Sequence, residues 1–368
     1  MSRNTDVFVI GGGPAGLAAA IAARMRGFEV TVADGARPPI DKACGEGLMP
    51  ETLAALQELG VGIDASDGVG LRGIRFLESS THAEAFFPGN HGIGLRRTVL
   101  HQKLIDRARD LDVRFLWETP VTGIFPGGVA AGGERIRARW IVGADGTHSR
   151  VRKWSGLDLG TRRTFRYASR RHYRVAPWSN CVEVYWGEDS QAYVTPVGED
   201  SVCVVLVSRS RLLRLSALGK EFPALARRLS CADEIGNERG GVTLTRRLRK
   251  VHRRPVVLVG DASGSVDAIT GEGLGLGFRQ ALALASAMES GELSRYERAH
   301  RKLAARPARM ARLMLLLGGR SVLRRRAMSA FSAHPGLFNR LLSAHTGGAS
   351  TMQIASAGAM LGWRLVRA

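Results

Sequence analysis

The start of the chain constrains the fold more than any other part of the sequence. Residues 6–10 (DVFVI) form a short apolar run rich in β-branched side chains, and an alanine-rich segment (LAAAIAARMRG) follows after a glycine loop. The loop places glycines at Gly11, Gly13 and Gly16, the spacing at which a tight turn, a close ligand approach and helix packing each exclude a side chain. The sequence therefore predicts a strand, a turn and a helix that bind a dinucleotide.

Three acidic residues follow predicted strands that carry the same kind of pattern. Asp34 directly follows the predicted strand 29–33 (EVTVA). Asp145 follows a predicted strand over 140–142, and Asp261 follows the apolar run PVVLV. A carboxylate at the carboxyl end of a parallel strand can bind ribose or polyol hydroxyls. Two strand-to-Gly-Asp junctions so far apart are not expected of a simple NAD dehydrogenase.

A second glycine-rich segment follows Asp261. Its glycines include Gly271 and Gly273, and a helix is predicted from Leu274 to Met288. The positive end of this helix could face the N1–C2=O edge of a flavin and stabilise the reduced ring. The same glycines also suit close packing of a helix on a sheet, and both explanations can hold together.

With these motifs in order, the chain resembles, over residues 5–290, a family of flavoproteins. That family includes p-hydroxybenzoate hydroxylase-type monooxygenases, geranylgeranyl reductases and tryptophan halogenases. The resemblance rests on GGGPAG, on RTVLHQKL, and on the Asp-Gly and Gly-Asp pairs at 145–146 and 260–261. It implies FAD as cofactor and these contact residues: Gly11, Gly13, Pro14, Ala15, Gly16, Asp34, Arg37, Cys44, Gly45, Arg97, Val121, Asp145, Asp261, Gly271, Gly273 and Leu274.

The expected fold class is α/β, with a Rossmann-like FAD-binding domain, an interleaved antiparallel β-sheet substrate domain and a helical C-terminal tail. We expect the FAD-binding domain to be discontinuous, over residues 1–70, 94–160 and 250–292. Residues 71–93 and 161–249 are expected to form the substrate sheet. Residues 293–368 are expected to form the basic helical C-terminal region.

The stretch DKACGEGLMP, residues 41–50, is predicted to be a loop that faces the flavin. Gly45 and Gly47 would let the backbone approach the ring, and Pro50 would start the next helix. The stretch resembles the CGGGL of geranylgeranyl reductases and the GESTIP loop of halogenases. Cys44 and Glu46 are therefore candidate catalytic residues, although Cys44 could equally be a packed, inert thiol.

The reaction is less constrained than the cofactor. Halogenases carry a W-x-W-x-I-P motif and a catalytic lysine, whereas this chain has QAYVTP at 191–196 and no lysine between residues 51 and 101. Reductases show Y-x-W-x-F-P at the same place, where this chain has Gln191, Tyr193 and Thr195. Because only one tyrosine remains of the aromatic wall for a prenyl chain, prenyl reduction is a less favoured alternative. The remaining family chemistry is hydroxylation by NAD(P)H and O2 through a flavin C4a-hydroperoxide. The leading hypothesis is a monooxygenase that acts on a lipophilic phenolic or quinone-like metabolite of polyketide type, with alkene reduction as the main alternative and halogenation as a minor one.

Such a hydroxylase needs a group that activates a phenol. His172 and Tyr193 are the candidates in the expected substrate sheet, and both also fit structural roles, as a satisfied histidine and as sheet packing. The four cysteines stand far apart without a CxxC pair, so no metal site is expected.

The charge of the chain is uneven. The formal net charge is +20, and residues 295–326 hold eleven Lys or Arg against one acid. The segment reads as a basic amphipathic helix that breaks near residues 318–319, and such helices fit an anionic membrane surface or a solvated face. We expect no nucleic-acid partner. No signal peptide or apolar span is apparent, so the expected location is the cytoplasm, with peripheral membrane contact through 295–326.

Overall fold

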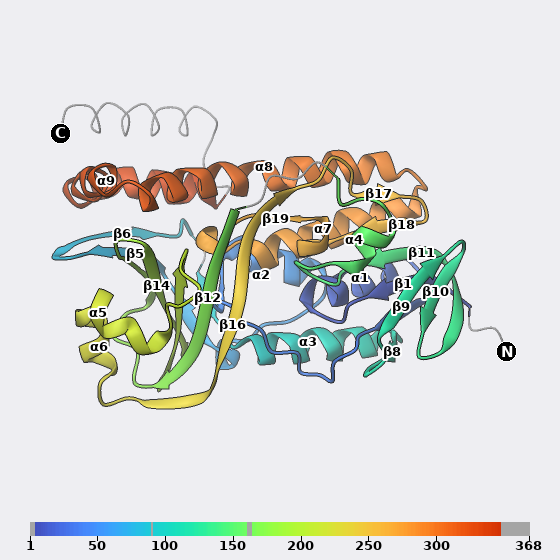
Figure 1. Ribbon diagram of the computed structural model, residues 1–368, viewed down its shortest axis with the longest axis horizontal. Coiled ribbons are helices and arrows are strands. Elements are labelled where there is room, and N and C mark those ends of the chain that lie inside the picture. The colour runs from blue at the N-terminus through green and yellow to red at the C-terminus, as the bar shows by residue number, and fades with distance from the viewer. Residues whose placement is uncertain (1–3, 90, 160–163, 347–368) are drawn as a thin grey trace.

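The computed structural model describes residues 4–89, 91–159 and 164–346, and within them the strands form three sheets (Figure 1). The first sheet has the order β17-β18-β11-β1-β2-β8, and its central pairs are parallel. Its strands are β1 (Asn4–Ile10), β2 (Val30–Ala33), β8 (Arg114–Leu116), β11 (Glu134–Gly143), β17 (His252–Arg253) and β18 (Val256–Leu258). The antiparallel pair β9 (Val121–Phe125) and β10 (Gly128–Ala131) extends from the long strand β11.

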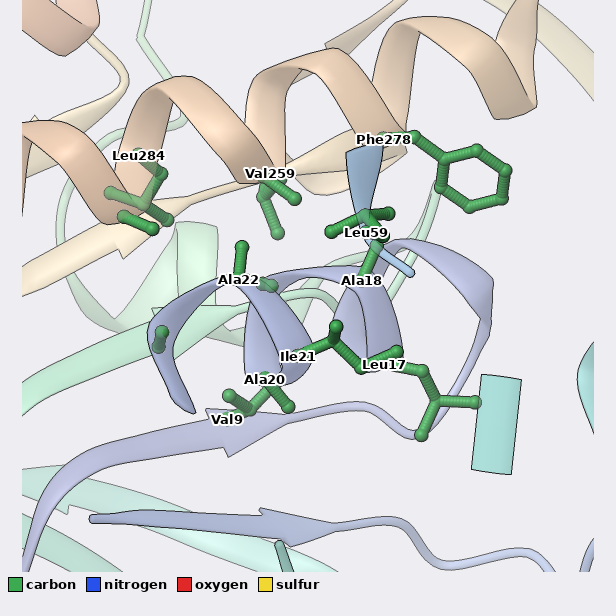
Figure 2. Packing of buried hydrophobic residues seen from close by; sticks show 14 of the residues in the cluster. Val9, Leu17, Ala18, Ala20, Ile21, Ala22, Leu59, Val259, Phe278 and Leu284 are labelled. Atoms are coloured by element: carbon green, nitrogen blue, oxygen red, sulfur yellow. The ribbon is translucent and has the colours of Figure 1, made fainter. Parts of the chain in front are cut away.

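Helices cover this first sheet. They are α1 (Pro14–Arg24), α2 (Pro50–Glu58), α3 (Arg97–Asp110), α4 (Arg150–Trp154) and α7 (Gly273–Glu289). Helix α1 lies between β1 and α7, so its small alanines allow close packing on both sides (Figure 2). Ile21 and Leu17 of α1 and Phe278 of α7 are fully buried in this core. The parallel order and the helix cover confirm the predicted α/β class with a Rossmann-like unit.

The second sheet is mostly antiparallel and has the order β19-β16-β12-β15-β14-β13-β5-β6. Its strands are β5 (Gly73–Glu78), β6 (Thr81–Phe86), β12 (Thr164–Arg174), β13 (Cys181–Trp186), β14 (Ser190–Gly198), β15 (Ser201–Ser208), β16 (Asp233–Arg247) and β19 (Gly264–Ser265). Figure 1 shows β12 and β16 as long strands that run from this sheet toward the FAD-binding part. A small third sheet, of β3 (Gly47–Leu48), β7 (Gly92–Gly94) and β4 (Val69–Leu71), lies where the two parts meet.

Both faces of the second sheet are covered at its centre. Val204 and Leu206 of β15 pack against α5 (Leu218–Glu221) and α6 (Pro223–Leu229), which follow the short turn η2 (Leu215–Ala217). Val205 and Val207, which alternate with them, line a cavity on the other side. The strand is therefore buried along its whole length although its two faces have different neighbours.

Three helices follow α7 and lie along one side of the molecule (Figure 1). They are α8 (Leu293–Gly318), α9 (Ser321–Ala333) and α10 (Pro335–His345). The break between α8 and α9 falls where Gly318 and Gly319 predict it. Among the described helices, none combines the length and the apolarity needed to cross a membrane.

The remaining helical turns are short. They are η1 (Ala65–Asp67), η3 (Gly260–Ser263) and η4 (Ala268–Thr270). The last two belong to the segment between β18 and α7, which borders the cavity.

Candidate functional site

The first glycine loop has the geometry that its spacing predicts. Gly11 adopts a φ of +111°, in the region that disfavours side chains, and leads from β1 into the turn. A Cβ atom on Gly16 would overlap the carbonyl oxygen of Gly11, so this glycine permits close packing of α1 on the turn. A Cβ atom on Gly13 would meet no protein atom within 4 Å, and Gly13 lies on the cavity wall. The space beside Gly13 is therefore open to a ligand.

Asp34 and His101 hold this loop in place. The backbone N–H of Gly12 donates to Asp34 Oδ2 over 2.7 Å, and the N–H of Ala36 donates to Asp34 Oδ1 over 2.8 Å. His101 is fully buried on α3, and its Nε2 lies 2.8 Å from the carbonyl oxygen of Gly12. Burial lowers the pKa of His101, so the neutral ring donates from Nε2 to that carbonyl. His101 stands inside the quoted RTVLHQKL motif, but its role depends on the fold and was not predicted.

A cavity of about 400 Å³ connects the glycine loops with the second sheet and the C-terminal helices. One end is bordered by Gly13 from the loop after β1, and by Asp261 and Gly273 from the segment between β18 and the start of α7. The other end is apolar, and its wall includes Phe76, Val184, Met314, Leu317, Phe331 and Phe338. The volume lies in the range of small-molecule sites, and the wall also carries polar side chains, among them Tyr193, Thr243 and His345.

The loop 41–47 forms part of the cavity wall, as the flavin-facing interpretation predicts. Lys42, Cys44, Gly45 and Glu46 all border the cavity, and a Cβ atom on Gly45 would meet nothing within 4 Å. Cys44 is partly buried, and its Sγ accepts a hydrogen bond from the backbone N–H of Glu46 over 3.4 Å. The structure thus places Cys44 on the cavity wall, while its contact with a flavin and its chemical role stay predictions.

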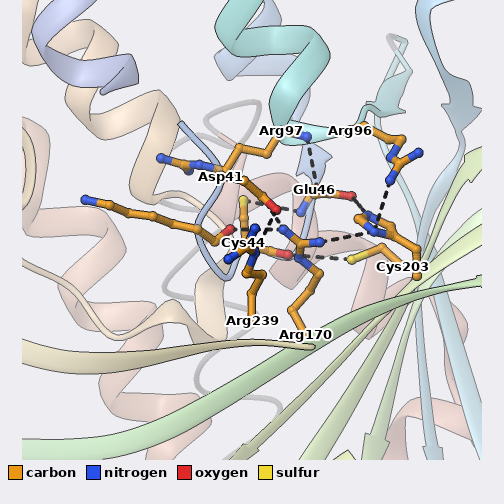
Figure 3. A network of polar contacts seen from close by, with 10 residues as sticks. Asp41, Cys44, Glu46, Arg96, Arg97, Arg170, Cys203 and Arg239 are labelled. Atoms are coloured by element: carbon orange, nitrogen blue, oxygen red, sulfur yellow. Dashed lines mark hydrogen bonds and ion pairs between the residues drawn. The ribbon is translucent and has the colours of Figure 1, made fainter. Parts of the chain in front are cut away.

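Glu46 is the centre of a buried network that joins this loop to α3 and to the second sheet (Figure 3). Its Oε1 accepts from the backbone N–H of Arg97 over 3.0 Å, at the start of α3, and its Oε2 lies 2.6 Å from His172 Nε2. Its carbonyl oxygen accepts from the N–H of Leu95. These contacts hold Glu46 at a φ of +59°, a backbone conformation that costs a non-glycine residue about 1 kcal/mol or more.

Two arginines define the protonation of His172. Arg170 Nη1 and Arg96 Nη2 approach His172 Nδ1 to 3.1 and 3.4 Å, and a guanidinium can only donate. His172 Nδ1 is therefore the acceptor, and Nε2 carries the proton that it donates to Glu46. The ligand atoms of Glu46, His172 and Cys203 lie within 4.8 Å of one another. However, both ring nitrogens of His172 already make hydrogen bonds, and two arginine cations lie beside them, which disfavours a metal ion. The group fits a structural hydrogen-bond network better than a metal site, and the predicted catalytic role of Glu46 and His172 stays a prediction.

Several polar atoms on the FAD side have no protein partner in the described part of the chain. Arg97 Nε and Asp145 Oδ1 are buried and unpaired, while Asp145 Oδ2 accepts from the N–H groups of Arg150 and Val151 at the start of α4. Asp261 Oδ2 accepts from Thr147 Oγ1 over 2.9 Å at the cavity border. The unpaired atoms are the kind that a bound polar ligand satisfies.

The remaining predicted contacts divide between the cavity and its surroundings. Pro14, Ala15, Gly271 and Leu274 border the cavity. Val121 is buried in β9 and Arg37 is exposed in the loop after β2, and neither borders the cavity. Their predicted contact with FAD stays a prediction.

Tyr193 lies on the cavity wall from β14. Its hydroxyl donates to Gln191 Oε1 over 3.0 Å, and Gln191 Oε1 also accepts from Arg166 Nη1. Burial raises the pKa of Tyr193, so the phenol stays protonated at neutral pH. Tyr193 therefore lies on the cavity wall as a neutral hydroxyl, and its predicted catalytic role stays a prediction.

The structure also brings to the cavity a histidine that sequence reasoning missed. His345, the last residue of α10, borders the cavity, and its Nε2 lies 3.2 Å from the carbonyl oxygen of Thr270. Its Nδ1 lies 3.5 Å from Glu272 Oε2 in the loop before α7. Burial raises the pKa of Glu272 to about 7 and lowers that of His345. No local pattern marks His345, because it lies beyond the residues that carry the family resemblance.

These features fit FAD. Glycines with open space at Gly13, Gly45 and Gly273 leave room along the wall, and Arg97, whose Nε is unpaired among the described residues, also borders the cavity. The first N–H groups of the long helix α7, which begins at Gly273, add a positive helix end.

Comparison with curated proteins finds flavoenzymes of different reactions. The chain is 26% identical over 324 residues to the menaquinone reductase of Mycobacterium tuberculosis H37Rv, a match that spans 79% of this chain and 78% of the relative. It is 37% identical over 175 residues to the 6-methylpretetramide 4-monooxygenase of Streptomyces rimosus, which spans 42% and 41% of the two chains.

The fold has a close counterpart among solved structures. A flavoprotein/dehydrogenase from Cytophaga hutchinsonii superposes with a TM-score of 0.80 over 93% of this chain and 92% of its own, at 21% identity. The model of the FAD binding domain family matches residues 4–304. The expected cofactor class is thereby confirmed, and the chain belongs to the FAD binding domain family of FAD-dependent oxidoreductases.

Proposed function

We propose that this protein is a monooxygenase that uses NAD(P)H and O2 to hydroxylate the ring of a lipophilic phenol or quinol. The observation that carries the proposal is one continuous cavity, which has the predicted FAD loops at one end and an apolar chamber at the other. This shape suits a molecule with a polar aromatic head and an aliphatic tail. The head would lie beside the glycine loops and the tail in the chamber.

The chamber is formed by two unrelated parts of the chain. Ile74 and Val184 come from the second sheet, whereas Met314 and Leu317 come from α8 and Phe338 comes from α10. These side chains offer no hydrogen-bond partner, and burial of an aliphatic tail among them is favourable by about 25 cal/mol for each Å² removed from water. The chamber therefore selects for tail length and apolarity.

Polar side chains on the cavity wall act on the head group. FAD, when bound, supplies the redox chemistry with O2. The hydroxyl of Tyr193 and the side chain of Thr243 border the cavity and can orient a ring hydroxyl, and the apolar wall excludes bulk water. His345 adds a neutral imidazole on the same wall.

Two relatives support a ring substrate. One is named for menaquinone and the other for hydroxylation of 6-methylpretetramide. We transfer to this chain only the shared chemistry, a cyclic head group that a flavoenzyme reduces or hydroxylates.

Alkene reduction is the second candidate. The apolar chamber would also hold a prenyl chain, and the menaquinone reductase match covers most of both chains. For that reaction bound FAD would supply the reducing equivalents, and a group on the cavity wall would deliver a proton to one carbon of the double bond.

Molecular oxygen separates the two reactions. The FAD-loaded protein is mixed with NADH or NADPH and a series of alkylphenols with tails of increasing length, under ¹⁸O2. Hydroxylation predicts phenol-stimulated NAD(P)H oxidation and one ¹⁸O atom in the product, with a higher kcat/KM for longer tails. Turnover of a prenylated substrate without oxygen, with loss of a double bond and no ¹⁸O, would overturn hydroxylation in favour of reduction.

We also propose that the substrate is taken from an anionic membrane surface. Arg298, Lys302, Arg309 and Arg312 lie at intervals of three, four and seven residues, so they share one exposed face of α8. None of the four pairs with an acidic side chain among the described residues. The apolar side of the same helix faces the chamber, so charge attraction rather than deep insertion would hold the protein to the lipid.

A further inference from the structure

A cluster of buried polar atoms beside the cavity has no hydrogen-bond partner within the described residues. The atoms are His345 Nδ1, Glu272 Oε2 and Glu51 Oε1, from α10, the loop before α7 and the first turn of α2. Glu272 is 4% exposed and His345 is 5% exposed, so water does not freely compensate these atoms. Buried unpaired groups of this kind are rare in proteins and often serve a function.

The contacts of His345 define its neutral form. Its Nε2 lies 3.2 Å from the carbonyl oxygen of Thr270, and a carbonyl can only accept a hydrogen bond. Nε2 therefore carries the proton, and the lone pair of Nδ1 points toward Glu272 Oε2 at 3.5 Å. An ionised Glu272 would place two acceptors face to face. A proton shared between Nδ1 and Oε2 removes this conflict.

The surroundings favour the neutral pair. Burial raises the pKa of Glu272 to about 7, against the attraction of Arg279 and Arg306. Burial also lowers the pKa of His345, whose charged form is favoured by Glu51 and disfavoured by the same two arginines. Near neutral pH the pair is therefore an imidazole with its proton on Nε2 and a carboxyl group that is protonated in part.

We propose that Glu272 and His345 form a proton relay that delivers one proton to the molecule that reacts in the cavity. His345 Nε2–H releases its hydrogen bond to Thr270, the N–H bond breaks, and the proton binds an acceptor atom of the reacting molecule. The O–H bond of Glu272 breaks and that proton forms an N–H bond at His345 Nδ1. Glu272 is left as a carboxylate and His345 as the other neutral tautomer, and no electrons are transferred in these two steps.

The relay rests on the proposed function, whose stoichiometry takes up one proton. Ring hydroxylation converts the ring, O2, NAD(P)H and one proton into the hydroxylated ring, NAD(P)⁺ and water. Reduction of an alkene by NAD(P)H also takes up one proton. Because the cavity wall is largely apolar, that proton needs a donor on the wall, and His345 lies on it.

Glu51 is the element that connects the relay with solvent. Its side chain is about one-fifth exposed, and its Oε1 lies 3.5 Å from Arg306 Nη2 on α8. Burial raises the pKa of Glu51, and the charge of Glu272 contributes in the same direction. A proton taken up at Glu51 can thus restore Glu272 after each turnover.

The first test follows the pair itself in the FAD-loaded protein without substrate. Protein with ¹⁵N-labelled histidine is titrated by NMR, and H345Q assigns the His345 signals. The relay predicts the neutral Nε2–H tautomer at pH 6, and a shift of the Nδ1 signal near pH 7 that is absent in E272Q. Ordinary protonation of His345 near pH 6.5, unchanged in E272Q, would overturn the proposal.

The second test measures turnover, with one exposed histidine and one exposed glutamate as matched controls. H345Q is expected to lower kcat by about 10²-fold, the usual contribution of a positioned acid, whereas H334Q at the exposed start of α10 has no effect. E272Q is expected to lower kcat and abolish the solvent isotope effect, unlike E289Q at the far end of α7. Unchanged kcat in both H345Q and E272Q would overturn the relay. A protein that shows the NMR shift but hydroxylates no phenol would contradict the proposed function and support the relay in reduction.

Discussion

Glu46 and His172 meet at 2.6 Å, although 126 residues separate them in the chain. Their contact joins the cavity loop 41–47 to strand β12 of the second sheet, while the other oxygen of Glu46 accepts from the start of α3. The two parts of the fold that border the cavity are therefore connected through one buried carboxylate.

Removal of that carboxylate is expected to destabilise the protein. In Glu46→Ala, His172 Nε2–H and the backbone N–H of Arg97 lose their acceptor, and each buried donor left unsatisfied costs about 1 to 3 kcal/mol. Urea unfolding measures the change, and Glu58→Ala at the end of α2 serves as a control with little effect. Unchanged unfolding with a complete loss of turnover would instead support the catalytic role predicted from the sequence.

The glycine loop gives a prediction for cofactor binding alone. In Gly13→Ala the new methyl group meets no protein atom within 4 Å, so the apoprotein should unfold as before. The methyl group projects into the cavity, and we expect the Kd for FAD to rise about 10-fold or more, equal to about 1.4 kcal/mol. Gly123→Ala in β9, also in open space but away from the cavity, should leave the Kd unchanged in a flavin fluorescence titration. Equal affinities of both variants would exclude Gly13 from the FAD site.

The parts of the site that the sequence predicts are those set by short-range spacing. The Gly11–Gly16 turn and the acidic residues after β2 and β11 depend on residues that are neighbours in the chain, so their pattern shows directly. The partners of Glu46 and His345 cannot be predicted in this way, because they lie 126 and 75 residues away in the chain and are brought together only by packing.

The neighbours of helix α8 also could not be predicted from the sequence alone. Its sequence is clearly amphipathic, and a membrane was one expected neighbour of the apolar side. In the structure Leu313, Met314 and Leu317 border the cavity, while the basic residues stay outside. Amphipathicity predicts that one side is covered, but only the fold shows what covers it.

The chamber can be shortened without a change in the FAD loops. Met314→Trp places a larger ring into the apolar end, and we expect kcat/KM to fall about 10-fold for long-tailed phenols and to stay unchanged for short ones. Leu316→Trp is the matched control, because Leu316 is 43% exposed on the outer side of the same helix. An equal loss for every tail length would contradict a tail-binding chamber.

Membrane contact is predicted to depend on the unpaired arginines of α8. Arg309→Gln with Arg312→Gln removes two of them, at about 1 kcal/mol each, so binding to vesicles with anionic lipid should weaken about 30-fold. Arg295→Gln with Arg301→Gln removes the same charge from residues that pair with Glu292 and Glu297, and it should have a smaller effect. Sedimentation with vesicles at low and high salt measures both, and equal effects would point to net charge alone.

The raised pKa of Glu272 predicts how stability depends on pH. Between pH 4.5 and about 7 the folded protein keeps a proton on Glu272 that the unfolded chain releases. The folded state then binds more protons, so the free energy of unfolding falls as pH rises through this window. The total loss is on the order of 3 kcal/mol, at about 1.4 kcal/mol for each unit of pKa difference. Glu272→Gln does not titrate, so it should gain stability relative to the wild type as pH rises from 4.5 to 7 and keep that gain above pH 7. Urea unfolding at pH 5, 6, 7 and 8 measures the difference, with Glu289→Gln as the exposed control. Parallel curves for wild type and Glu272→Gln would mean that Glu272 titrates as an ordinary carboxylate and cannot hold the proton that the relay requires.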